Sequence, residues 1–147
     1  PPPIMHEVVK AMAPLMPRDR ARYLMGVGTP RDLLICIRAG IDMFDCVMPT
    51  RNARNGHLFT PDGHLNIGNA AHKTDRRPVV EGCPCEACTR YNRAYLSHLF
   101  RAKEILYYRL ATLHNLQFYL DLVRGARQAI LEGRIDSYVD TALARLG

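Results

Sequence analysis

Residues 22–32 read Arg-Tyr-Leu-Met-Gly-Val-Gly-Thr-Pro-Arg-Asp, and this stretch decides the fold. Its first six residues form a short apolar run of strand length. Thr29 then stands where a helix N-cap is expected, with Pro30 at the first helical position and Asp32 in the first turn. The sequence therefore predicts a strand, a turn and a helix that runs to Ala39.

The same pattern continues on both sides of this stretch. Residues 4–16 carry apolar side chains at a helical rhythm, and residues 43–48 form a second apolar run that ends at Pro49. Helix, strand, helix, strand at this spacing is typical of β/α units with a parallel sheet. Two such units cannot close a barrel, and their exposed edges would be a liability. Since the chain also begins at Pro1 without an initiator Met, we expect a processed product or part of a longer protein.

Composition limits the class of protein. The chain has 147 residues, of which 48% are apolar, as in a globular domain. No run approaches the roughly 20 apolar residues of a membrane span, so we expect no membrane association. A net charge of +6 is compatible with a polyanion such as nucleic acid. Five cysteines, three of them clustered, favour metal ligation in a reducing compartment, and we expect a cytoplasmic location.

The cysteine run Cys83-Pro-Cys85-Glu-Ala-Cys88 is the clearest candidate site. Three thiols this close cannot pair into disulfides without leaving one over, whereas with one histidine they complete a Cys₃His set typical of structural zinc. The single residue between Cys83 and Cys85 is unusual, since common zinc fingers place two to four residues there. The alternative is that these cysteines are free thiols in the core.

Two downstream histidines compete for the fourth ligand position. On one continuous helix, at about 100° per residue, His98 and His114 would lie about 160° apart. They cannot then both face one metal, and spacing alone leaves the choice open. In either case four protein ligands leave no position for water, so the expected role of zinc is structural.

Asp45 is a second candidate, because it lies inside the apolar run 43–48. A carboxylate there is costly unless it is paired or used. In β/α folds the carboxyl ends of the strands face the active site, where a carboxylate can act as a nucleophile on a glycosidic carbon. The alternative is a structural Asp that pairs with an arginine or caps a loop.

Two segments beside these strands suit a phosphate backbone. Residues 50–56, Thr-Arg-Asn-Ala-Arg-Asn-Gly, combine two arginines with amides, although a solvated polar loop is the simpler reading. Residues 26–30, Gly-Val-Gly-Thr-Pro, open a helix N-terminus that suits an anion, but the signal is weak. Tyr23 and Met25 are more typical of a core.

The rest of the chain divides into two parts. Residues 50–82 are rich in Asn, Gly, His and Arg, which predicts hairpins or loops around a small metal-bound lobe. Residues 90–132 have a helical apolar stripe that is longer than an ordinary globular helix, so we expect a break near Lys103.

Several of these stretches resemble one family. They are Tyr-Leu-Met-Gly-Val-Gly-Thr-Pro from Tyr23, Gly-Ile-Asp-Met-Phe-Asp-Cys-Val-Met-Pro-Thr-Arg-Asn-Ala-Arg-Asn-Gly from Gly40, Cys-Pro-Cys-Glu-Ala-Cys from Cys83, Arg-Ala-Tyr-Leu-Ser-His-Leu-Phe-Arg-Ala from Arg93 and Leu-His-Asn-Leu from Leu113. In this order, over nearly the whole chain, the sequence resembles the C-terminal portion of bacterial tRNA-guanine transglycosylase, also called queuine tRNA-ribosyltransferase.

The resemblance implies an α/β fold, the C-terminal part of a (β/α)₈ TIM barrel with an inserted zinc-binding subdomain and long C-terminal helices. Residues 1–49 would be the last β/α units of the barrel. Residues 50–89 would hold a tRNA-contacting loop and the zinc subdomain, and helices in residues 90–147 would complete the zinc site and pack on the barrel. The family also implies a homodimer.

The resemblance also assigns roles to residues. The zinc ligands would be Cys83, Cys85, Cys88 and His114, and the catalytic nucleophile would be Asp45. Met25 would pack against the bound base. The RNA-binding residues would be Gly26, Val27, Gly28, Thr29, Pro30, Arg31 and Asp32, together with Thr50, Arg51, Asn52, Ala53 and Arg54.

The implied reaction exchanges the wobble guanine of tRNAs with G-U-N anticodons for a 7-deazaguanine base, 7-aminomethyl-7-deazaguanine, on the way to queuosine. No residue here matches the acid/base carboxylate that the reaction needs. We therefore expect a fragment that lacks the N-terminal half and is inactive alone. The alternatives are a non-catalytic tRNA-binding relative or subunit with a structural zinc, and a free-standing zinc-bound RNA-binding module.

Overall fold

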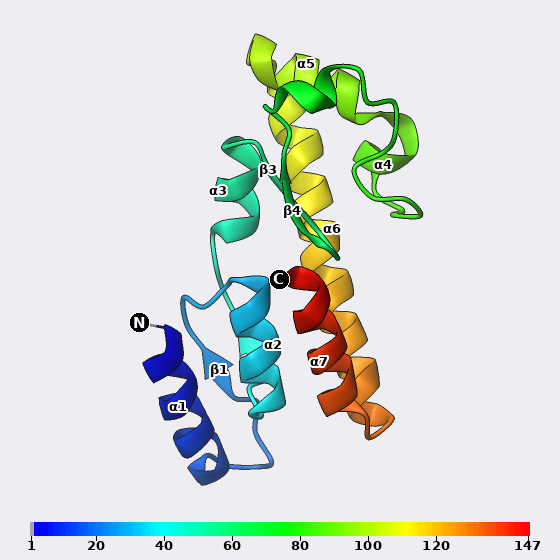
Figure 1. Ribbon diagram of the computed structural model, residues 1–147. Helices are drawn as coiled ribbons and strands as arrows, with labels where there is room; N and C mark the ends of the chain where they lie inside the picture. The colour runs from blue at the N-terminus through cyan, green and yellow to red at the C-terminus, as the bar shows by residue number, and fades with distance from the viewer. Residues whose placement is uncertain (1) are drawn as a thin grey trace. The chain divides into compact units, whose positions relative to one another are not determined.

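The computed structural model describes residues 2–147 and divides into two compact units (Figure 1). The first unit comprises the residues up to Met48 together with Leu122–Arg145. The second unit comprises Pro49–Asp121 and the last two residues. The domain boundaries expected from the sequence stay a prediction.

The first unit is built on two short parallel strands and their flanking helices. Its elements are α1 (Pro2–Met12), the 3₁₀ helix η1 (Ala13–Leu15), β1 (Tyr23–Leu24), α2 (Pro30–Arg38), β2 (Met43–Phe44), the end of α6 (Ile105–Leu131) and α7 (Ile135–Leu146). Tyr23 pairs with Met43 and Leu24 with Phe44 in parallel register. This confirms the predicted helix–strand–helix–strand order, although the parallel sheet has only two strands and the described residues form no barrel.

The helix α2 begins as predicted. The hydroxyl oxygen of Thr29 accepts a hydrogen bond from the backbone N–H of Asp32 at 3.0 Å, which is an N-cap. The carboxylate of Asp32 also lies 2.7 Å from the imidazole Nε2 of His6, and this contact joins α2 to α1. A small core of Val9, Ala13, Cys36 and Ile41 closes between the two helices.

Both strands are shorter than predicted, for local reasons. Gly26 has φ +73°, outside the extended region, so β1 cannot continue through the run 22–27. The second half of the run 43–48 does not extend β2, because the chain turns there into a helix, α3 (Met48–Arg54). The expectation of a loop at Thr50–Arg54 was therefore wrong.

The second unit packs a hairpin, α3 and three further α-helices around one core. Its remaining elements are β3 (His57–Thr60), β4 (Gly63–Asn66), the 3₁₀ helix η2 (Ala70–Lys73), α4 (Glu86–Arg90), α5 (Arg93–Ala102) and the first part of α6. The strands β3 and β4 are antiparallel, which confirms a predicted hairpin. The core includes Leu58, Ile67, Val79, Leu96, Tyr107 and Leu110.

The predicted break in the long helical region is confirmed at Lys103. This residue has φ +56°, a left-handed conformation, and its N–H closes the last turn of α5 on the carbonyls of Leu99 and Phe100. The helix α6 then runs without interruption over 27 residues. None of the helices in residues 2–147 is both long and apolar enough to cross a membrane.

Asn115 ties α6 to the hairpin. Its side chain is fully buried, and its Oδ1 accepts from the Phe59 N–H at 3.0 Å. Its Nδ2 donates to the carbonyls of Pro49 and His57 at 2.9 and 3.0 Å. One side chain therefore satisfies three backbone groups, two of them on β3, and holds that strand along the helix.

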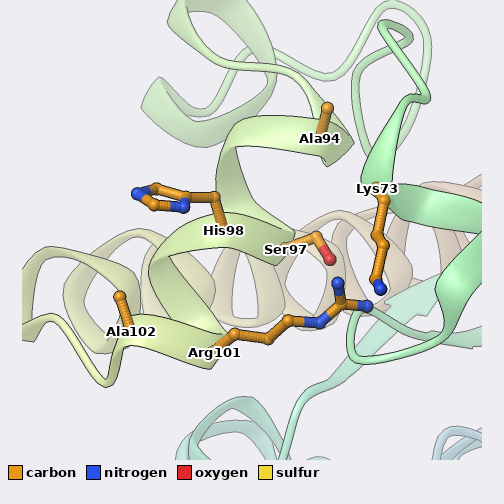
Figure 2. A pocket seen from close by; sticks show the side chains of 6 residues that line it. All are labelled: Lys73, Ala94, Ser97, His98, Arg101 and Ala102. Carbon is orange, nitrogen blue, oxygen red and sulfur yellow. The ribbon is translucent and has the colours of Figure 1, made fainter.

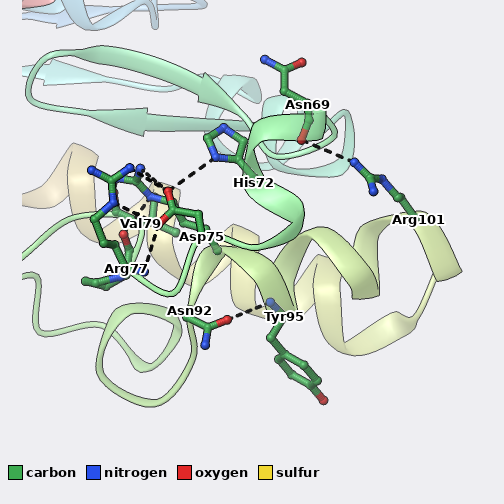
Figure 3. Close-up of polar contacts among 10 residues, drawn as sticks. Asn69, His72, Asp75, Arg77, Val79, Asn92, Tyr95 and Arg101 are labelled. Carbon is green, nitrogen blue, oxygen red and sulfur yellow. Dashed lines mark hydrogen bonds and ion pairs between the residues drawn. The ribbon is translucent and has the colours of Figure 1, made fainter.

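The segment between η2 and α4 is held by Asp75 (Figure 3). Its carboxylate accepts from the backbone and side chain of Arg77 at 2.8–3.0 Å and from Arg93 at 3.1 Å. Arg93 also donates to the carbonyls of Pro78 and Val79, both at 2.9 Å. The hydrogen bonds from Arg77 hold the pKa of Asp75 below its usual range, so the carboxylate stays charged and fastens the segment to the start of α5.

Candidate functional site

Four soft donors meet in the second unit. Cys83 precedes α4, Cys85 is the N-cap residue of α4, Cys88 lies inside it, and His114 projects from α6. The three sulfur atoms and one imidazole nitrogen all lie within 4.8 Å of one another. The structure thus brings together the residues named from the resemblance.

The distances fit one tetrahedral cation. The His114 Nδ1 atom lies 3.4 Å from the Cys88 sulfur and 3.6 Å from the Cys85 sulfur. Zinc bonds of about 2.3 Å to sulfur and about 2.0 Å to nitrogen place such ligands about 3.6 Å apart in a tetrahedron. The four residues are therefore placed so that they could hold a single metal ion.

His114 is oriented for this role. Its side chain is only 1% exposed, and its Nε2 lies 2.8 Å from the carbonyl oxygen of Phe59, to which it can only donate. That hydrogen bond fixes the tautomer, so the Nδ1 lone pair faces the sulfurs. A backbone carbonyl that accepts from the other ring nitrogen is the usual support of a metal-binding histidine.

The cluster also favours a thiolate. A hydrogen bond from Cys88 lowers the pKa of Cys85 well below that of a free thiol, although burial opposes the shift. The same interaction raises the pKa of Cys88. The thiolate is the form that binds metal, so this lowered pKa favours metal binding at Cys85.

His98 does not reach the cluster. It lies on α5, exposed to solvent, and is absent from the donor group found among residues 2–147. The angular comparison of His98 with His114 assumed one continuous helix, whereas the chain breaks at Lys103 between them. Spacing could not choose between the histidines for that reason.

A second candidate site lies in the first unit, at the carboxyl ends of β1 and β2. Asp45 follows β2 directly and is exposed. Its Oδ1 accepts a hydrogen bond from the Tyr23 hydroxyl at 2.7 Å and from the Gly26 N–H at 2.9 Å. These partners hold the carboxylate at the end of the parallel pair, where β/α folds carry their chemistry.

The hydrogen bonds around Asp45 set its charge. The bond from Tyr23, and then the bond from Gly26, lower the pKa of Asp45. The same bond raises the pKa of Tyr23, so the tyrosine remains a donor. Asp45 is therefore an ionised carboxylate at neutral pH, as a nucleophile requires.

Tyr23 is a residue that the sequence reasoning missed, since it was assigned to the core. The structure leaves it half exposed and bonded to Asp45. The available signal was the parallel register: Tyr23 pairs with Met43, and Asp45 is two residues further on the same face.

The residues expected to touch substrate fall into two groups. In the first unit Met25 is 73% exposed beside Gly26, and Arg31 is exposed in the first turn of α2, but Asp32 is buried against His6 and Thr29. Residues 26–29 form the loop between β1 and α2. In the second unit Thr50–Arg54 lie on α3, with Ala53 buried and both arginines exposed.

Comparison with known proteins identifies the class. The sequence model of the family described as "Queuine tRNA-ribosyltransferase" matches residues 1–147, and the chain belongs to this family. It is 60% identical over 134 residues to the queuine tRNA-ribosyltransferase of Helicobacter pylori (strain ATCC 700392 / 26695), covering 91% of this chain and 36% of that protein. It is 58% identical over 141 residues to that of Helicobacter acinonychis (strain Sheeba), covering 96% and 38%. The chain thus spans little more than a third of the curated relatives it matches.

The metal centre can be tested by exchanging its histidine. We expect His114→Ala to lose the divalent cation, because a buried nitrogen ligand and its link to Phe59 disappear together. Metal content per chain, measured by plasma mass spectrometry, should fall from one to well below one, with a lower Tm. His98→Ala is the matched control and should keep both values. Equal metal content in the two variants would show that His114 is not a ligand.

The charge of Asp45 can be tested by removing one hydroxyl. We expect Tyr23→Phe to raise the pKa of Asp45, because the strongest bond to its charged form is lost. A ¹³C titration of the Asp45 carboxyl group by NMR measures this. Tyr95→Phe, on the exposed face of α5, is the control and should leave the titration unchanged. An unshifted curve in Tyr23→Phe would contradict the bond between Tyr23 and Asp45.

Proposed function

We propose that this chain is the C-terminal part of a tRNA-guanine transglycosylase, in which Asp45 is the nucleophile. The observation that carries the proposal is the ionised, exposed Asp45 held by Tyr23 and Gly26 at the ends of two parallel strands, in a chain of the queuine tRNA-ribosyltransferase family. The substrate would be a tRNA with a G-U-N anticodon, and the incoming base 7-aminomethyl-7-deazaguanine.

The chemistry follows from the carboxylate. Asp45 would attack C1′ of the ribose while the bond from C1′ to the guanine nitrogen breaks, through an oxocarbenium-like transition state. The product is an ester between Asp45 and the ribose, and the departing guanine takes up a proton. The incoming base would then lose a proton and displace Asp45, so that two inversions give retention.

Within this scheme, the neighbours of Asp45 position the nucleophile and do not themselves react. The Tyr23 hydroxyl and the Gly26 N–H both bind Oδ1, which fixes the carboxylate plane and keeps it charged. The proton donor to guanine would come from the remainder of the protein, since no residue in this chain matches the family motif for it. The chain alone would therefore be inactive.

The cysteine cluster would hold a structural Zn²⁺. Four protein donors complete a closed tetrahedral set, so the ion would link α4 to α6 and supply no reactive water. The exposed Met25 would stack on the base. The two segments 26–32 and 50–54, with exposed Arg31, Arg51 and Arg54, would contact the RNA backbone.

The parallel pair and its flanking helices support a place in a larger barrel. A strand followed by a helix and a parallel neighbouring strand, here β1, α2 and β2, is the repeating unit of a (β/α)₈ fold. The full-length protein would supply the missing units. By the same resemblance it would act in the cytoplasm as a homodimer.

Replacing the nucleophile tests the proposal. In the full-length protein, Asp45→Asn should reduce exchange of labelled guanine into unmodified tRNA by about 10³-fold or more, because no covalent ester forms. Binding of tRNA and Tm should remain near those of the wild type. Asp42→Asn, three residues earlier, is the control: it loses a carboxylate charge but keeps an oxygen that can accept from the Arg22 N–H, and it should keep exchange.

Two outcomes would contradict this function. Full exchange by Asp45→Asn would remove Asp45 from the reaction. Tight tRNA binding without exchange by the wild-type full-length protein would instead indicate a non-catalytic tRNA-binding relative.

A further inference from the structure

A hollow of about 420 Å³ opens in the second unit between η2 and α5 (Figure 2). Its lining residues belong neither to the cysteine cluster nor to the segment 50–54, and the proposed reaction makes no use of them. One side is formed by α5 residues three or four positions apart, which share one helix face. The lining residues are Lys73, Ala94, Ser97, His98, Arg101 and Ala102.

The first sign of a ligand is Ser97. Its side chain is only 1% exposed, yet its Oγ has no hydrogen-bond partner among residues 2–147. A buried hydroxyl without a partner is costly, and native structures rarely leave one. In Figure 2 this oxygen points toward the space that Lys73 and Arg101 also approach.

The second sign is the charge of the walls. Lys73 extends into the hollow from η2 and Arg101 from α5, and none of the six lining residues is acidic. Two cations directed at one space repel each other unless an anion lies between them. Lys73 makes no ion pair with any residue in the described part of the chain.

Arg101 is held in place at the rim. Its Nη2 donates to the carbonyl of Gly68 at 2.8 Å. It also lies 3.4 Å from the carbonyl oxygen of Asn69, the contact marked in Figure 3. The anchored guanidinium still has further N–H donors, so a ligand would meet a fixed cation and not a mobile surface side chain. A fixed donor loses less side-chain entropy on binding.

We propose that this hollow binds a phosphate group of the RNA backbone. An ammonium, a guanidinium and a hydroxyl would donate to different oxygens of one tetrahedral phosphate. Ala94 and Ala102 leave room for the adjoining sugar. The choice of RNA as the source rests on the proposed function, since a tRNA substrate brings many phosphates to a basic chain. The contact would be additional to segments 26–32 and 50–54.

The test uses the full-length protein and unmodified tRNA. Lys73→Gln should raise the Kd about 5- to 10-fold and lower the slope of log Kd against log salt by about 0.7–0.9, the share of one phosphate contact. Lys103→Gln, which removes the same charge at the end of α5 outside the hollow, should change neither value.

Ser97→Ala separates ligand binding from folding. Because the Ser97 hydroxyl has no partner in the part of the chain that the structure describes, its removal should not lower Tm. The Kd for tRNA should nevertheless rise about 3- to 10-fold, since one hydrogen bond to a charged group is lost.

The outcomes distinguish this inference from the proposed function. Loss of tRNA binding by the wild type would overturn both. Normal binding and exchange by the wild type, with Lys73→Gln equal to Lys103→Gln, would overturn the phosphate site alone. Two other results, each with unchanged tRNA affinity in Lys73→Gln, would also overturn the RNA phosphate site. If inorganic phosphate raised the Tm of the wild type but not of Lys73→Gln, the ligand of the hollow would be free phosphate. If Lys73→Gln instead altered the oligomeric state, the ligand would be a carboxylate of another protein chain.

Discussion

The hydrogen bond from His114 to the carbonyl of Phe59 is the interaction on which the second unit depends. Through it, His114 on α6 contacts both the cysteine cluster at α4 and the strand β3 of the hairpin. The next residue, Asn115, binds the same strand through Phe59 and His57. Two consecutive residues of α6 therefore contact both the candidate metal site and the hairpin. A small lobe rich in loops gains from such a link, because its own apolar core is limited.

The candidate reactive carboxylate in the first unit depends on a different constraint, the parallel pairing of β1 and β2. This register puts the ends of both strands at one edge, so Asp45 meets the Tyr23 hydroxyl and the Gly26 amide. Gly26 combines two functions here: its positive φ ends β1, and the same turn presents its N–H to the carboxylate. The shortness of the strand is thus part of how Asp45 is held.

The features predictable from sequence were those with local causes. The Thr29 cap, the break at Lys103 and the grouping of three cysteines each depend on residues close in the chain. The helix α3 was missed because its Asn and Arg content suggested a loop, although Pro49 in its first turn and Gly56 after its end are ordinary helix boundaries. The pairing of Tyr23 with Asp45 depends on strand register, and the choice of His114 over His98 depends on packing. Neither is encoded in spacing alone.

The proposed function depends on a covalent step at Asp45. The most direct measurement is to quench the full-length protein during exchange, digest it with protease and ribonuclease, and map any ribose adduct by mass spectrometry. We expect a nucleotide attached through an ester to the peptide that contains Asp45, and we expect this adduct to disappear in excess incoming base. An adduct on another residue, or exchange that proceeds with no adduct at any time, would contradict the proposed function.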